Sequence, residues 1–119
     1  MFNKKTTWHR IFSSLEEAEN VIPLNKAIAV PVNKKTICLA RTKKGFFALD
    51  DACPHQGGPL SEGECTPGGA IVCPWHKYHF DLKTGRFVGG QGDYTETYPV
   101  EVREDGLFIG LTKRMWNLF

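Results

Sequence analysis

Four side chains with metal-binding chemistry are concentrated in one stretch of this sequence. Cys53 and His55 form a C-x-H pair, Cys73 and His76 form a C-x-x-H pair, and 17 residues separate the two pairs. Thiolate and imidazole groups suit borderline and soft metals such as zinc and iron. Since residues two or three apart can project to the same side of one loop, two facing loops could surround a metal. The spacing therefore predicts a metal site built from two loops.

Each pair combines a cysteine with a histidine, and a proline follows each cysteine. Zinc motifs usually begin with C-x-x-C, whereas two cysteines and two histidines ligate the [2Fe-2S] cluster of a Rieske centre. The motif resembles the Rieske family, specifically the small ferredoxins of bacterial ring-hydroxylating oxygenases and the small subunits of nitrite reductases. The resemblance covers about residues 45–90, and the later segments YPVEV and DGLFIGL also look like the family.

The resemblance implies one Rieske-type [2Fe-2S] cluster per chain. Cys53 and Cys73 would ligate one iron, and His55 and His76 would ligate the other through one ring nitrogen each. The outer nitrogen of each histidine would then face solvent or a partner protein. A structural zinc site or a redox-sensing module is the alternative from a different functional class.

Five further residues near the ligands are candidates for binding the cofactor: Gly57, Gly58, Pro59, Trp75 and Tyr78. The resemblance implies that the first three form a backbone nest, in which the N–H groups of the two glycines approach the cluster sulfides. Glycine suits such a nest because no Cβ keeps the backbone away, although a simple turn would also explain these glycines. The two aromatic residues flank the second pair, where they could guide docking or shield the cluster.

The resemblance also predicts a low reduction potential. High-potential Rieske proteins of the cytochrome complexes have a disulfide between the loops, at positions occupied here by Gly58 and Trp75. They place a serine and a tyrosine, which donate to the cluster sulfurs, where this chain has Tyr78 and Phe80. Because fewer donors stabilise the reduced cluster less, we expect a potential near the low end of the Rieske range.

The other two cysteines lie outside the ligand pairs. Cys38 is in the middle of a predicted strand, on the face opposite Ile37 and Leu39, and such cysteines are usually small core residues. Cys65 lies between the ligand pairs and is expected to be a free thiol. Without an export signal, four cysteines favour ligands or thiols over disulfides.

Alternating apolar segments on both sides of the ligand region predict an antiparallel β-sheet. Strands are expected at residues 8–12, 27–32, 35–42, 45–50, 70–73 and 76–82, and in two segments of 97–111 around an Asp-Gly turn. One or two helical turns are expected after Ser13 or Ser14, because Glu16 or Glu17 follows at the spacing of a capping box.

The expected fold is an all-β, Rieske-type antiparallel barrel or sandwich in a single domain, residues 1–119. Residues 1–49 and 96–119 would form a basal β domain, and residues 50–95 an inserted cluster-binding subdomain. The chain has 119 residues, of which 41% are hydrophobic and 24% charged, as in globular domains. It has no apolar run near the roughly 20 residues that span a bilayer and no signal-like segment, so we expect a cytoplasmic protein.

The predicted function is one-electron transfer from a reductase to a terminal oxygenase or similar enzyme. No 2-His-1-carboxylate set is evident, so we expect a carrier without its own substrate site. A small subunit of a nitrite-reductase-like enzyme is the main alternative. We expect no nucleic-acid partner, because the Lys34-Lys35 and Lys43-Lys44 pairs lie at predicted hairpin turns, where solvated lysines are common. We expect no membrane partner, because no apolar run is long enough to span a bilayer.

Overall fold

The computed structural model describes residues 4–54, 58–75, 77–89 and 94–114. In chain order, the elements are β1 (Lys4–Phe12), α1 (Leu15–Val21), β2 (Ala27–Val32), β3 (Lys35–Thr42), β4 (Gly45–Asp50), the 3-10 helix η1 (Leu60–Glu62), β5 (Glu64–Cys65), β6 (Ala70–Val72), β7 (His79–Asp81), β8 (Thr97–Tyr98), β9 (Val100–Arg103) and β10 (Gly106–Arg114). No helix in these ranges is long and apolar enough to cross a membrane.

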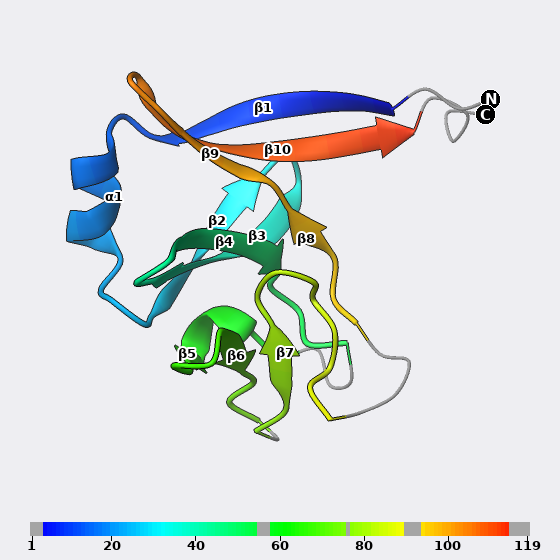
Figure 1. The fold of residues 1–119 in the computed structure, drawn as a ribbon. Helices are drawn as coiled ribbons and strands as arrows, with labels where there is room; N and C mark the ends of the chain where they lie inside the picture. Colours follow the sequence, from blue (N-terminus) through cyan, green and yellow to red (C-terminus); the bar gives the residue numbers. More distant parts are fainter. Residues whose placement is uncertain (1–3, 55–57, 76, 90–93, 115–119) are drawn as a thin grey trace.

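Three antiparallel sheets form the fold. The central sheet has the strand order β2-β3-β4-β8, and it lies between a sheet of order β1-β10-β9 and a small sheet of order β5-β6-β7 (Figure 1). The helix α1 stands beside the end of the first of these outer sheets. The expected all-β, antiparallel architecture is therefore confirmed.

Each face of the central sheet covers a separate hydrophobic core. Ile37 and Leu39 of β3 belong to a basal core, together with residues of α1, β2 and β10. Cys38 and Ala40, between them in sequence, belong to a second core beneath the small sheet. Since side chains alternate along a strand, this confirms that Cys38 lies on the face opposite Ile37 and Leu39. β3 is consequently buried on both sides.

The expected strands 27–32, 35–42 and 45–50 have the predicted bounds, and the lysine pairs lie exposed around the hairpin turns between them. The first strand begins at Lys4 rather than at Trp8, because its early residues pair with the end of β10. The strand expected over 76–82 was too long: β7 comprises only His79–Asp81. The helix η1 and the strand β5 were not expected from the sequence.

The helix α1 begins as the capping pattern predicted. The Ser14 hydroxyl accepts a hydrogen bond from the Glu17 backbone N–H at 3.0 Å, and the Glu17 carboxylate accepts one from the Ser13 N–H at 2.8 Å. Hydrogen bonds to this carboxylate from the Ser13 backbone N–H and hydroxyl lower the pKa of Glu17. At the other end, the Arg41 guanidinium donates to the Ile22 carbonyl oxygen at 3.0 Å and so ties the helix to β3.

Candidate metal centre

Two loops carry the predicted ligand pairs. The first follows β4 and the second joins β6 to β7, at the end of the molecule farthest from β1 and β10 (Figure 1). Cys53 and Cys73 are described by the structure, whereas the predicted ligands His55 and His76 and the candidate Gly57 lie outside the described residues.

The two loops are closed by matching backbone hydrogen bonds. The Cys53 N–H donates to the Gly58 carbonyl oxygen at 2.8 Å, and the Cys73 N–H donates to the Tyr78 carbonyl oxygen at 2.7 Å. In both cases the acceptor lies five positions after the cysteine. Each predicted pair therefore falls within a short closed loop that begins at its cysteine.

The two cysteines belong to one buried core. Cys53 is 2% exposed and Cys73 is fully buried, and both pack in the cluster beneath the small sheet. Two buried thiols at the bases of adjacent loops fit the sulfur half of a Cys₂His₂ cluster site. The described residues alone contain no group of three or more His, Cys, Asp or Glu side chains placed to hold a metal, and both predicted imidazoles lie beyond them.

The loops touch through Gly58 and Trp75. A Cβ on residue 58 would lie only 2.7 Å from Cδ2 of the Trp75 ring, so this contact requires glycine. Gly58 is buried, and Trp75 remains 58% exposed. At the two positions where the resemblance places a disulfide in high-potential relatives, this protein has a tryptophan ring lying against a glycine. Pro59, the next residue, pairs with Ala52 and precedes η1.

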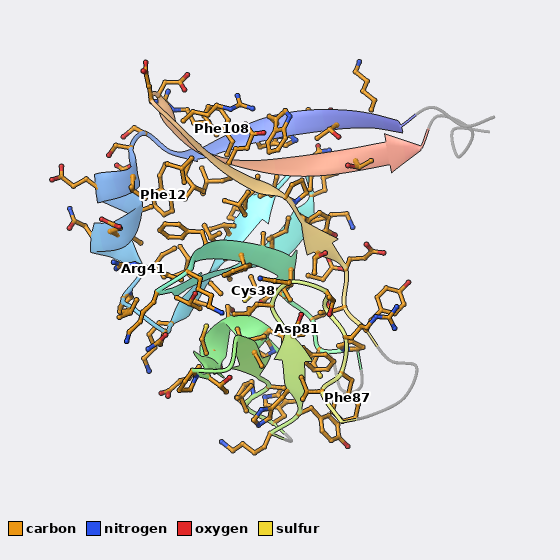
Figure 2. The ribbon with its side chains drawn as sticks, in the orientation of Figure 1. Phe12, Cys38, Arg41, Asp81, Phe87 and Phe108 are labelled. Atoms are coloured by element: carbon orange, nitrogen blue, oxygen red, sulfur yellow. The ribbon has the colours of Figure 1, made fainter. Side chains whose placement is uncertain are left out.

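Aromatic side chains support the second loop. The ring of Tyr78 meets that of Phe87 edge-on, with 5.1 Å between the ring centroids. The ring centroid of Phe80 lies 5.8 Å from that of Phe87, which is labelled in Figure 2. Phe80 is fully buried and offers no hydroxyl donor. His79, the first residue of β7, is exposed.

The thiol pKa is raised at both Cys38 and Cys65. Burial raises the pKa of the Cys65 thiol to about 11, with a smaller contribution from Glu64. Burial also raises the pKa of Cys38 well above its usual value, assisted by the negative charge of Asp51. A raised pKa disfavours the thiolate that metals bind. These two cysteines are therefore core thiols, in agreement with the structural interpretation of Cys38.

Two acidic residues at the base of the first loop were not singled out from the sequence. The Asp51 carboxylate accepts a hydrogen bond from the Ser61 N–H at 2.8 Å, and its backbone carbonyl accepts one from the Leu60 N–H at 2.7 Å. The Tyr98 hydroxyl donates to the Asp50 carboxylate at 2.6 Å. The only available signal was two consecutive aspartates between a strand end and a ligand pair.

Comparison with known proteins gives consistent results. The family model for the Rieske [2Fe-2S] domain matches residues 13–99. The 3-phenylpropionate/cinnamic acid dioxygenase ferredoxin subunit of Photorhabdus laumondii is 35% identical over 69 residues, which are 57% of this chain and 66% of that protein. The protein of the same name from Escherichia coli K12 is 32% identical over 91 residues, 76% of this chain and 85% of that protein.

A solved structure shows the same fold. The ferredoxin of carbazole 1,9a-dioxygenase from Nocardioides aromaticivorans superposes with a TM-score of 0.74 over 87% of this chain and 96% of that one, at 21% identity. At that identity the likeness concerns the fold alone. The three-sheet architecture is therefore shared with a known ferredoxin.

Proposed function

Because the chain belongs to the Rieske [2Fe-2S] domain family, we propose that it carries single electrons from a reductase to a terminal oxygenase or similar redox enzyme. The observation that supports this most directly is the burial of Cys53 and Cys73 in one core. Each cysteine lies at the start of a loop that its own backbone N–H closes with a hydrogen bond. The similar proteins named above, ferredoxin subunits of a dioxygenase, support the same role.

In this proposal, Cys53, His55, Cys73 and His76 hold the cluster, which supplies reversible one-electron chemistry when bound. Gly58 brings the first loop against the second, and Trp75 covers that contact from the solvent side. Gly57, Pro59 and Tyr78 would complete the binding loops. The buried core beneath excludes water from the two sulfur ligands.

We further propose a low reduction potential. Phe80 is buried where a high-potential relative would have a hydroxyl, and Gly58 with Trp75 takes the place of the interloop disulfide. Fewer hydrogen bonds to the cluster sulfurs favour the oxidised form. The expected outcome of a redox titration is a midpoint potential far below those of the cytochrome-complex proteins.

The proposal makes the protein a component of a larger oxidoreductase system, without a substrate site of its own, located in the cytoplasm. It also treats residues 50–95 as the cluster-binding subdomain and residues 1–49 and 96–119 as the basal domain. The small sheet β5-β6-β7 is built wholly from the middle range, which supports this division.

The test is purification under anaerobic, iron-replete conditions, followed by metal analysis and electron paramagnetic resonance. We expect a brown protein with two irons per chain and a signal that appears on reduction. A colourless protein loaded with zinc would contradict the proposal and select the structural alternative.

A second experiment separates the carrier from a nitrite-reductase subunit, the other assignment open from sequence. A carrier should purify without a large haem-containing chain and should accept electrons from a ferredoxin reductase. Stable co-purification with such a haem protein would select the alternative.

A further inference from the structure

Two consecutive aspartates fasten the first loop to the central sheet. Asp50 ends β4, and its backbone N–H donates to the Glu96 carbonyl oxygen at 2.9 Å. Its carboxylate accepts the Tyr98 hydroxyl hydrogen bond at 2.6 Å. Residues 50 and 96–98 are the points where the chain leaves the central sheet and returns to it. Asp50 therefore links the segment that leaves the central sheet to the segment that returns to it.

Asp51 fastens the far end of the same loop. Its backbone N–H donates to the Thr36 carbonyl oxygen of β3 at 3.2 Å. Its carbonyl and carboxylate oxygens accept the N–H groups of Leu60 and Ser61, the first residues of η1. The segment between them contains Cys53. Asp51 consequently fixes both ends of the loop that presents this cysteine.

The charge of Asp51 needs a separate explanation. The residue is only 8% exposed, and a buried carboxylate has a large desolvation penalty. An asparagine could accept the Ser61 hydrogen bond through its side-chain oxygen without that penalty. What the aspartate adds is a buried negative charge two residues before the proposed ligand Cys53.

We propose that Asp50 and Asp51 are positioning residues that hold the first ligand loop on the sheet and that their charges lower the reduction potential of the site. This rests on the proposed function. Reduction adds an electron, and a fixed negative charge nearby disfavours that addition most where water cannot screen it. Asp51, which is buried, should therefore have a larger effect than Asp50, which is only partly buried.

The charge is tested with D51N and D50N, since each keeps an oxygen that can accept the observed hydrogen bond. Redox titration should give a positive shift in midpoint potential for both variants, larger for D51N. The matched control is D105N, which removes the same charge at the β9–β10 turn, at the opposite end of the molecule (Figure 1). It should leave the potential unchanged.

The positioning role is tested separately with D51A, which removes the acceptor as well as the charge. We expect a loss of bound iron and faster amide exchange at Leu60 and Ser61, neither of which D105N should show. If D51N fails to hold iron, D50N still tests the charge.

Potentials of D51N and D50N equal to that of the parent protein would overturn the tuning role. Unchanged iron content and amide exchange in D51A would overturn the positioning role. A parent protein without any iron–sulfur signal would instead contradict the proposed function, so the two failures are distinguishable.

Discussion

The two faces of the central sheet support different kinds of structure. The basal core consists of aliphatic and alanine side chains, and long strands cover it: β1 and β10 have nine residues each. The opposite core contains all four cysteines, and the strands over it have two or three residues. One sheet thus has a conventional hydrophobic core on one side and a sulfur-rich core on the other.

The difference indicates where each half gains its stability. Long antiparallel ladders and aliphatic burial stabilise the basal half without any cofactor. Very short strands and loops contribute little by themselves, so the other half depends on hydrogen bonds to the central sheet and, in our proposal, on the metal site.

Replacing Cys73 by alanine should abolish iron binding, because the proposed site loses one of its two sulfur ligands. Amide exchange should become faster in β6 and β7 while β1 and β10 stay protected. Metal analysis and hydrogen exchange measure the two effects. Cys65→Ala is the matched control, a cysteine of the same core outside the ligand pairs, and it should retain iron. Equal loss of protection in β1 would contradict the division into two halves.

Adjacent residues of β3 compare the two cores directly. Leu39→Ala should reduce the free energy of unfolding by about 2–5 kcal/mol, since a fully buried leucine leaves a cavity in the basal core. Cys38→Ala removes one atom from the other core and should reduce it by only about 1 kcal/mol. Urea denaturation of both variants measures the difference. Similar losses would show that the two cores contribute alike at this strand.

The sequence predicted those parts of the fold that depend on local signals. Strands β2, β3 and β4 follow from residue alternation and turn residues, and the helix start follows from Ser14 and its capping partner Glu17. The two-residue strand β5 is too short for any periodicity to show. It exists because Glu64 and Cys65 pair with β6, a contact that no local pattern reveals.

Part of the candidate site, like part of the fold, could be predicted from local sequence signals. Ligand type and spacing are sequence properties, so Cys53 and Cys73 could be singled out, and the structure places both in one core. Their role as ligands, with His55 and His76, stays a prediction. The contributions of Asp50 and Asp51 depend on partners nine or more positions away and could not be seen from the sequence.

Gly58→Ala tests the contact between the two loops. The added methyl group would overlap the Trp75 ring, which must move outward, and we expect a loss of about 1 kcal/mol in stability. The double variant Gly58→Ala/Trp75→Ala should lose less than the sum of the single changes, because the overlap is absent. Thermal unfolding of the four proteins measures this coupling. Additive losses would show that the contact does not hold the loops together.

Ser14→Ala should reduce the free energy of unfolding by about 1 kcal/mol, and this effect should be confined to the basal half. The substitution removes the hydroxyl that accepts the Glu17 N–H at the start of α1, and loss of such a cap weakens a helix by about that amount. Because α1 packs on the basal core through Ala18 and not on the cysteine-rich core, the iron content and the reduction potential should not change. Urea denaturation with a parallel redox titration provides the measurement. A shifted potential would show that the two faces of the sheet are coupled.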